Sequence, residues 1–376
     1  MKIVYICDAL ANHGGLERVV IDKANWLVEH EGYEVCLLTA NQSTHSVCFP
    51  LHPDVSHCDI GICFHHQYRF SGLRRQVKRL QLKRLFRKRL TEKFVELAPD
   101  VIICTCFDYL RDIVRVKGNI PLVFESHASC LADYFLGDGL LRRLYVWYSL
   151  RAVRNTQMVV ALTQGDAHEW NKLTPHVCVI PNIVHLNESG SYSDCRAQSA
   201  IFVGRFTKQK DISSLLGIWS LVHQRHPDWC LHIYGGYGEE QDALFAKIKQ
   251  MDANIQVHES TPHILEKYRE SSMMLLTSIF EPFGLVLSEA MSCGLPVVAF
   301  DCPYGPADII TDGVDGFLIR DRSIEDFVDK VSLLIDQQEL RRKMGKAGIE
   351  SSQRYEASKI MPLWKDLFSH LVDRTV

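Results

Sequence analysis

The sequence predicts an α/β protein with two doubly wound domains, each built on a parallel sheet with helices on both faces. The chain has 376 residues, too many for one compact core and about right for two α/β domains. Short apolar segments alternate with helical patterns almost from end to end. Many of these segments are continuous apolar runs, as expected of parallel strands that are buried on both faces.

The predicted strands fall into two groups separated by a linker. In the first half of the chain they are residues 3–6, 34–38, 101–104, 122–125, 158–161 and 177–180. In the second half they are residues 200–203, 231–234, 255–257, 273–276 and 296–300. The segment between Asn182 and Ser199 is polar, rich in Ser and Asn, and without a period, so it predicts a linker. We expect domains over residues 1–188 and 189–356, and an amphipathic helix over residues 357–372.

Composition and charge indicate an ordinary soluble balance. Charged residues make up 23% of the chain and the net charge is −3, which argues against a surface that binds nucleic acid throughout. The 13 cysteines are odd in number and form no CxxC pair, so we expect reduced thiols in a cytosol. The first ten residues predict a strand rather than a signal peptide. No apolar stretch reaches the roughly 18 residues of a membrane span.

One segment is strongly basic. Residues 69–93 carry eleven Lys or Arg and a single acid, Glu92, with apolar residues at approximately helical spacing. The cations that we expect to face a membrane or an acceptor are Arg74, Arg75, Lys78, Arg79, Lys83, Arg84, Arg87 and Lys88. Such a helix can lie on anionic headgroups or face a lipid diphosphate. A surface helix with one face packed on the sheet is the alternative. A nucleic-acid role lacks a known binding motif.

Two glycine-containing segments follow predicted strands. Gly14 and Gly15 precede a predicted helix over residues 16–29, where backbone N–H groups can approach an anion. Gly235 and Gly236, in HIYGGYGEE, predict a flexible loop that allows close approach of a nucleotide. Neither segment has the full GxGxxG pattern, and a plain turn without a ligand is the alternative interpretation of each; for Gly14 and Gly15 taken alone it is the favoured one.

Two cations follow the first strand of the second domain. In VGRFTKQKD the strand ends at Val203, so Arg205 and Lys210 lie at its carboxyl end. Ligands bind at that edge in open α/β sheets, and these two side chains suit a diphosphate leaving group. Two solvated surface charges are the alternative interpretation.

The most informative segment is SIFEPFGLVLSEAMSCGLPVVA, residues 278–299. A helix is predicted from about Leu285, and the N–H groups of Phe283, Gly284 and Leu285 form a site for phosphate at its start. Glu289 lies within this apolar helix, where a carboxylate is costly unless it is bonded. We expect Glu289 to hold ribose hydroxyls and Glu281 to hold hydroxyls of the transferred sugar.

The spacing of Glu281 and Glu289, E-x7-E, resembles that of the retaining glycosyltransferases of family four, which have the GT-B fold. The other motifs follow in order along nearly the whole chain: GGLERV, Pro181-Asn182, GRF..QK at 204–210, GGYG, EPFGLVLSEAMSCGLPVVA and DGVDGFLI at 312–319. The resemblance implies two facing Rossmann-like domains with the active site in the cleft. It also implies a last helix, residues 357–376, that crosses back to the first domain.

The resemblance also implies roles for the residues that match. Arg205 and Lys210 would neutralise the donor diphosphate, Gly15 would lie near the phosphates and the acceptor, and His127 would lie near the reacting sugar. One departure is Asp211, where the family usually has Gly; Asp is nevertheless a good N-cap. The chain has no D-x-D, so we expect transfer that requires no metal or other cofactor.

The segment DCPYGPADII, residues 301–310, is similar to that of bacterial enzymes that extend undecaprenyl-diphosphate-linked oligosaccharides. We therefore expect a hexosyltransferase that uses a nucleotide sugar, with UDP as the expected nucleotide, and acts peripherally at the inner face of the plasma membrane. The alternatives are a sugar-nucleotide epimerase of the same fold and a scaffold that binds RNA or membrane through residues 69–93.

Overall fold

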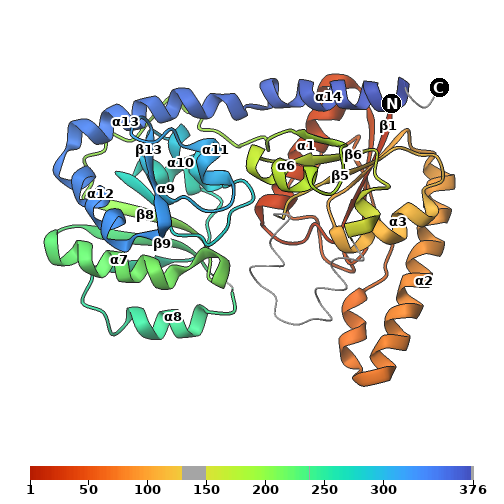
Figure 1. Ribbon diagram of the computed structural model, residues 1–376, viewed down its shortest axis with the longest axis horizontal. Coiled ribbons are helices and arrows are strands. Elements are labelled where there is room, and N and C mark those ends of the chain that lie inside the picture. The colour runs from red at the N-terminus through yellow and green to blue at the C-terminus, as the bar shows by residue number, and fades with distance from the viewer. Residues whose placement is uncertain (129–149, 237, 374–376) are drawn as a thin grey trace. The chain divides into compact units, whose positions relative to one another are not determined.

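The computed structural model describes residues 1–128, 150–236 and 238–373, and Figure 1 shows the course of the chain. The chain divides into two compact units. Unit 1 comprises Met1–Ile183 and Ala357–Val376, and unit 2 comprises Val184–Glu356. Each unit contains one parallel sheet, so the prediction of two doubly wound domains is confirmed.

Unit 1 is built on a seven-stranded sheet in the order β3-β2-β1-β4-β5-β6-β7. Its strands are β1 (Lys2–Cys7), β2 (Glu34–Thr39), β3 (Ser56–Asp59), β4 (Val101–Cys104), β5 (Leu122–Glu125), β6 (Met158–Ala161) and β7 (Val177–Val179). All neighbouring strands pair in parallel. The central strands are buried, as their continuous apolar sequences require.

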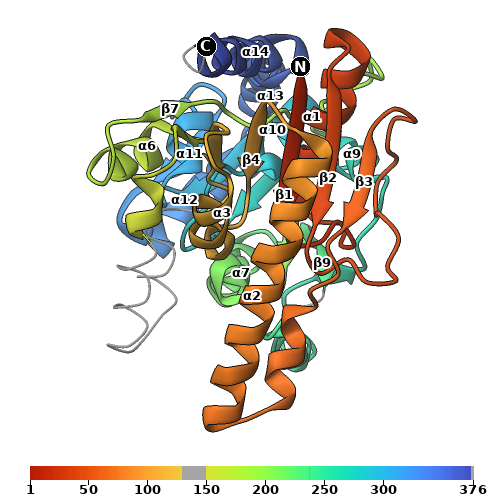
Figure 2. The ribbon, with the colours of Figure 1, turned by 90° about the vertical axis from the view of Figure 1, so that its right-hand side faces the viewer.

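The described helices of unit 1 are α1 (Gly15–Glu31), α2 (Gly72–Leu97), α3 (Leu110–Val116), α6 (Gln164–Asn171) and α14 (Ala357–Asp373), with the 3₁₀ turns η1 (Phe64–Arg69) and η2 (Phe107–Tyr109). Helix α14 packs beside α1, where Ile360, Trp364 and Phe368 are buried. In both views, η1 and the first turns of α2 project beyond the sheet of unit 1 (Figures 1 and 2).

Unit 2 is built on a six-stranded sheet in the order β10-β9-β8-β11-β12-β13. Its strands are β8 (Ser199–Arg205), β9 (Cys230–Gly236), β10 (Ile255–His258), β11 (Met273–Leu276), β12 (Val297–Phe300) and β13 (Gly316–Ile319). Successive strands lie on one side of β8 up to β10 and on the other side from β11 onward. The strand order therefore reverses between β8 and β11.

The helices of unit 2 are α7 (Ile212–Arg225), α8 (Gln241–Ile248), α9 (Ile264–Arg269), α10 (Leu285–Ser292), α11 (Gly305–Ile309), α12 (Ile324–Asp336) and α13 (Gln338–Ser352). Three 3₁₀ turns accompany them: η3 (Lys208–Lys210), η4 (Arg320–Arg322) and η5 (Gln353–Tyr355). One apolar core lies between α7, α12 and the sheet, and contains Phe202, Trp219 and Phe327.

Two edge strands were not predicted. Strand β3 has the polar sequence SHCD, and β13 is a four-residue GFLI. Edge strands are paired on one side only, so they need neither the length nor the apolar run that reveals a central strand. No helix in the described part of the chain is long and apolar enough to span a membrane. The described cysteines are free thiols.

Candidate active site

The reversal of strand order between β8 and β11 brings two loops together at the carboxyl edge of the unit 2 sheet. The N–H of Ile279 donates to the carbonyl of Gln209 at 2.7 Å, and the Gln209 side chain donates to the carbonyl of Phe280 at 3.1 Å. The Thr277 hydroxyl donates to the carbonyls of Lys210 and Asp211. Open α/β sheets bind ligands at this point of reversal.

Two of the predicted catalytic side chains meet at this edge. Lys210 Nζ lies 2.5 Å from Glu281 Oε2, and both side chains are largely buried. The Ser278 hydroxyl donates to the same carboxylate oxygen at 3.1 Å. Arg205 is exposed and is the last residue of β8, which ends two residues later than predicted. Among the described residues, no ion pair involves the Arg205 guanidinium.

The segment after β12 clamps the backbone of Glu281. The N–H of Glu281 donates to Pro303 O at 2.7 Å, and the Glu281 carbonyl accepts from Tyr304 at 3.0 Å and Gly305 at 2.8 Å. A Cβ at Gly305 would lie 1.7 Å from the carbonyl oxygen of Phe283, so only glycine fits there. The Pro303–Tyr304 peptide is cis. The segment DCPYGP thus supports Glu281 and the start of α10.

Helix α10 begins where the sequence predicted. Gly284 is its N-cap with φ 103°, a conformation that favours glycine, and Phe283 is buried before it. The first N–H groups of the helix have no partner within the helix, so they face the end that a phosphate would approach. Glu289 is half-buried and accepts a bond from the Tyr268 hydroxyl at 3.4 Å, so this carboxylate is bonded, as expected.

Gly235 and Gly236 lie in β9 rather than in the flexible loop that the sequence suggested. They pair with Gly204 and Arg205 of β8. A Cβ at Gly235 would lie 2.0 Å from the carbonyl oxygen of Gly204, so close approach of two strands explains this glycine without a ligand. Gly236 has φ 141° and nothing within 4 Å of a Cβ, so it leaves open space beside Arg205.

The backbone conformation of Asp211 explains why Asp can stand where the family usually has Gly. Its φ of 45° and ψ of 54° lie in the left-handed region, which favours glycine and tolerates Asp. Its carboxylate caps α7 by accepting from Ser214 N at 3.2 Å, as predicted, and it also pairs with Arg322 at 2.5 Å. Arg322 in turn donates to the carbonyls of Thr277 and Ser278. Asp211 therefore helps to hold the β8 and β11 loops together.

His127 and the glycines Gly14 and Gly15 belong to unit 1. Gly14 is the N-cap of α1 and Gly15 its first residue, so both lie at a helix start, as predicted. His127 follows β5, and its Nε2 lies 2.9 Å from Glu125 Oε1, at an angle that does not form a hydrogen bond. Glu125 also forms an ion pair with Lys23 of α1, and both of these side chains are 1% exposed.

Polar side chains that were not predicted as site residues also meet at the carboxyl edge of the unit 1 sheet. Asp8 follows β1 and Asn41 follows β2, and the Asn41 amide donates to the Asp8 carboxylate at 2.6 Å. The Tyr109 hydroxyl donates to the same carboxylate. Burial and then Asp8 raise the pKa of Tyr109 well above its usual value. The sequence positions of Asp8 and Asn41 could have predicted this cluster, because polar residues that follow parallel strands converge at one edge of the sheet.

The predicted basic helix is α2, but its two halves differ. Leu82, Phe86, Leu90 and Phe94 are buried against unit 1, whereas Leu73, Val77 and Leu80 of the first turns are exposed. Some of the predicted acceptor-facing cations have a structural partner: Lys83 and Arg87 lie 3.3 and 3.5 Å from the buried carboxylate of Asp112. Lys88 pairs with Glu92. The apolar side chains of α2 are therefore buried in its second half and exposed in its projecting first half.

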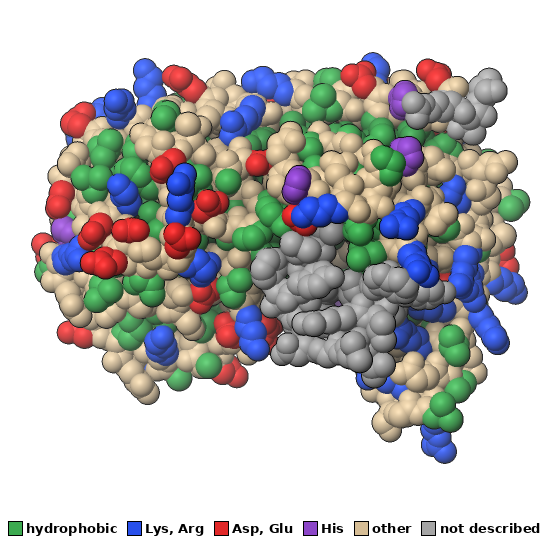
Figure 3. Space-filling view, in the orientation of Figure 1, with side chains coloured by type: hydrophobic (Ala, Val, Ile, Leu, Met, Phe, Trp, Pro, Cys, Tyr) green, Lys and Arg blue, Asp and Glu red, His purple; other side chains and the backbone are tan. Residues whose placement is uncertain are grey.

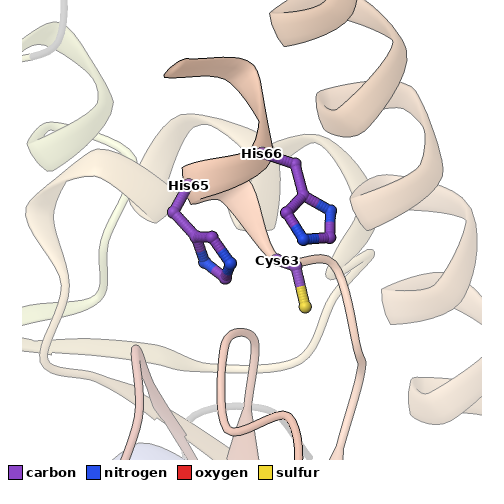
Figure 4. A group of neighbouring side chains, drawn as sticks. All are labelled: Cys63, His65 and His66. Carbon is purple, nitrogen blue, oxygen red and sulfur yellow. The ribbon is translucent and has the colours of Figure 1, made fainter. Parts of the chain in front are cut away.

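Three side chains around η1 are of types that bind transition metals. Cys63, His65 and His66 place their sulfur and ring nitrogen atoms within 4.8 Å of one another. Figure 4 shows the three side chains extending to the same side of the η1 backbone. Partial burial and then Arg69 lower the pKa of His66, which favours the neutral imidazole. No metal site was expected from the sequence.

Comparison with known proteins agrees with this geometry. Residues 13–188 match the family model described as Glycosyltransferase Family 4, and residues 196–351 match that of Glycosyl transferases group 1. The amylovoran biosynthesis glycosyltransferase AmsD of Erwinia amylovora is 30% identical over 98% of this chain and 99% of its own length. An uncharacterized glycosyltransferase of Haemophilus influenzae is 27% identical over 97% of this chain and 99% of its own.

Solved structures share the fold. TarM of Staphylococcus aureus, in complex with UDP, superposes with a TM-score of 0.80 at 15% identity, over 98% of this chain and 99% of its own. Sucrose-phosphate synthase of Thermosynechococcus elongatus gives 0.82 at 18% identity, over 99% of each chain. The expected enzyme class is confirmed, and the epimerase and scaffold alternatives are set aside. The chain belongs to glycosyltransferase family 4 and has the GT-B fold.

Proposed function

We propose that this enzyme moves a hexose or N-acetylhexosamine from a UDP-sugar to a sugar acceptor, with retention of the anomeric configuration. The observation that carries the proposal is the Lys210–Glu281 pair, at the point of the unit 2 sheet where the strand order reverses. Exposed Arg205 ends β8 at the same edge of that sheet. The names of similar proteins support the nucleotide: TarM of Staphylococcus aureus and HepE of Anabaena were both solved with UDP.

The donor nucleotide would bind to unit 2. Arg205 offers a planar fork of donors and Lys210 a point charge for the diphosphate, and the first N–H groups of α10 add a third source of positive potential. Glu289, half-buried and bonded to Tyr268, would accept from the two ribose hydroxyls. Glu281, held by the segment after β12, would accept from hydroxyls of the transferred sugar.

The proposed transfer mechanism depends on which atoms become charged as the donor bond breaks. As the bond between the anomeric carbon and the leaving oxygen lengthens, positive charge grows on the sugar and negative charge on the β-phosphate. Arg205 and Lys210 would stabilise the phosphate charge without a metal. The departing phosphate oxygen would accept the proton of the acceptor hydroxyl on the same face, and the acceptor oxygen would bond to the anomeric carbon there. His127 would lie near the reacting sugar.

The acceptor would be a glycan linked to undecaprenyl diphosphate at the inner face of the plasma membrane. The AmsD relative is named for the biosynthesis of a polysaccharide, amylovoran. The projecting part of unit 1, residues 68–80, offers a surface for such a membrane, and we call it the basic tip. Its exposed apolar side chains are Tyr68, Phe70, Leu73, Val77 and Leu80.

The basic tip also carries cations, and Figure 3 shows Lys or Arg and hydrophobic side chains together on one face of the projecting part. The cations of the tip are Arg69, Arg74, Arg75, Lys78 and Arg79. Exposed apolar groups that enter the headgroup region, surrounded by cations that attract anionic lipids, are the two contributions that hold an interfacial helix. Binding there would bring unit 1 to the lipid diphosphate.

The test is acceptor-dependent release of the nucleotide. The protein would be incubated with a panel of UDP- and GDP-sugars and a lipid-linked sugar acceptor, and free nucleotide and glycosylated lipid would be measured together. The proposal predicts release of UDP only when the acceptor is present, and an α-linked product from an α-linked donor. Lys210→Ala and Glu289→Ala should abolish turnover while the chain stays folded. Normal turnover in either variant would refute the site.

A further inference from the structure

Lys23 is a lysine inside the core of unit 1. It lies on the face of α1 that packs against the sheet and α14, and its side chain is 1% exposed. Its ammonium lies 4.5 Å from the ring centre of Trp364 and 5.8 Å from that of Tyr5. A lysine is almost never buried to this extent unless it is paired. Its partner is Glu125, the last residue of β5.

The pair is connected to His127. A single carboxylate oxygen, Glu125 Oε1, contacts both the ammonium of Lys23 and Nε2 of His127. The other oxygen, Oε2, is buried and has no hydrogen-bond partner among the described residues. The main chain at this point is fixed as well, because the N–H of Ser126 donates to Val160 O at 2.9 Å.

Burial and charge explain what the pair can do. Burial alone would raise the pKa of Glu125, but Lys23 and then His127 outweigh it and lower that pKa to about 2. Glu125 is therefore an anion at neutral pH. His127 Nε2 lies 2.9 Å from this anion, outside hydrogen-bond geometry. The negative charge at that distance still favours the tautomer whose proton is on Nε2, and leaves the Nδ1 lone pair free to accept. A buried ion pair adds little stability compared with apolar residues, so its presence calls for another explanation.

We propose that Lys23 and Glu125 are positioning residues for His127: the buried ion pair fixes the tautomer and the direction of the imidazole. The inference rests on the proposed role of His127 near the reacting sugar. Lys23 acts through Glu125, and neither residue touches the substrate. The ring then presents one defined nitrogen to the substrate in every turnover.

The first measurement is spectroscopic and does not depend on activity. Ring ¹⁵N shifts of His127, assigned from their loss in His127→Asn, report which nitrogen carries the proton. In the wild type we expect the Nε2–H tautomer, and in Glu125→Ala a mixture of the two. The matched control is Lys117→Met, which removes another buried lysine of unit 1; that lysine donates to the carbonyls of Gly118 and Ile120. Ring signals unchanged in Glu125→Ala would overturn the inference.

The second measurement is a kinetic cycle. Glu125→Ala should lower kcat at least about tenfold and leave KM for the nucleotide sugar within about twofold. Glu125→Ala added to His127→Asn should cost nothing further, because the carboxylate acts through the ring. Independent, multiplying losses would contradict the proposal. Full activity of His127→Asn would refute the proposed role of His127 near the reacting sugar. The spectroscopic result would still decide whether the ion pair positions the ring.

Variants with a buried unpaired charge can fail to fold, so a charge-neutral variant completes the design. Lys23→Met combined with Glu125→Leu removes both charges and leaves no uncompensated ion. If the pair served only stability, this double variant would recover the wild-type kcat. If the pair positions His127, the double variant stays folded, as thermal unfolding would show, but remains as slow as His127→Asn.

A second and independent observation concerns the cluster of Cys63, His65 and His66. We infer that these three side chains form a binding site for a Zn²⁺ or Co²⁺ ion, with water as the fourth ligand. Tetrahedral zinc needs N and S ligands at about 2.0–2.3 Å from the metal, so atoms within 4.8 Å of one another close the site by small side-chain rotations. The site would tie η1 into a fixed loop beside the basic tip.

The test is titration with Co²⁺ alone, followed by Zn²⁺. Binding through Cys63 produces a sulfur-to-cobalt charge-transfer band that Zn²⁺ abolishes. We expect the band in the wild type and in Cys48→Ser, which removes a partly buried thiol elsewhere in unit 1, and its loss in Cys63→Ser. His65→Ala and His66→Ala should each weaken binding at least about tenfold. No band in the wild type, or a band that persists in Cys63→Ser, would overturn the inference.

Discussion

Lys210 Nζ lies 2.5 Å from Glu281 Oε2, although the two residues are 71 positions apart. The contact exists because the loops after β8 and β11 are adjacent where the strand order reverses. Each side chain neutralises the other, so the donor would enter a site in which Arg205 carries the uncompensated positive charge. Lys210 would then contact both the donor diphosphate and Glu281. Glu281 would contact both Lys210 and the hydroxyls of the sugar.

Asp211 gives a stability prediction. Asp211→Val should destabilise the protein by about 2–3 kcal/mol, because it adds left-handed strain and removes the helix cap and the partner of Arg322. Asp211→Gly should cost about 1 kcal/mol or less, since glycine adopts this conformation freely. Urea unfolding would measure both. Equal losses in the two variants would show that the backbone conformation does not matter here.

Gly305 gives a prediction for the site. Gly305→Ala should displace the Phe283 carbonyl, which a Cβ would approach to 1.7 Å, and with it the clamp on Glu281. We expect kcat to fall by at least about tenfold, measured as UDP release. The matched control is Gly217→Ala in α7, where a Cβ meets nothing within 4 Å. That variant should be fully active and more stable by about 0.5–1 kcal/mol. Full activity of Gly305→Ala would contradict this part of the account.

The basic tip gives a membrane prediction. Charge reversal of Arg74, Arg75 and Lys78 together should abolish co-sedimentation with vesicles that contain anionic lipid, and added salt should weaken binding of the wild type. Leu73→Ser with Leu80→Ser should weaken binding to the same vesicles at low salt, because the apolar contribution is lost. The control reverses Lys343 and Lys346, exposed residues of α13. Vesicle binding that survives both changes in the tip would exclude it as the membrane contact.

The buried Glu125 gives a pH prediction. Its pKa falls from about 4.3 in an unfolded chain to about 2 in the folded protein. The contribution of ionised Glu125 to the free energy of unfolding is therefore fully present above the unfolded pKa. It is lost as the pH falls from the unfolded pKa through the folded pKa. Urea midpoints measured between about pH 6 and pH 3 should fall more steeply in the wild type than in Glu125→Gln. Parallel curves would show that Glu125 is not held ionised.

Much of the fold could be predicted because central parallel strands are apolar throughout. Strands β4, β5, β6 and β11 have the predicted bounds. Strands β3 and β13 were missed, since an edge strand can be short or polar. The burial of α2 could be predicted only in part, because a helical period shows which side chains share a face but not where the sheet beneath that face ends.

The proximity of Lys210 and Glu281 could be predicted because they follow strands whose carboxyl ends meet. Lys23 could not be found in this way. It lies in VVIDKANWL, where one polar residue on a helix indicates an exposed position, and its partner Glu125 is 102 residues away. Only the packing of α1 on β5 reveals the pair. The left-handed conformation of Asp211 was likewise not predicted. The family preference for glycine at that position is consistent with it, since glycine adopts this conformation readily.

The central claim is that Arg205 and Lys210 hold the diphosphate of the donor. Calorimetric titration of UDP into the wild type, Arg205→Ala, Lys210→Ala and the control Lys208→Ala tests it most directly, since Lys208 is an exposed lysine of the same turn. The account predicts that each of the first two substitutions weakens UDP binding at least about tenfold and that the control binds like the wild type. UDP binding of unchanged affinity in Lys210→Ala and Arg205→Ala would contradict it.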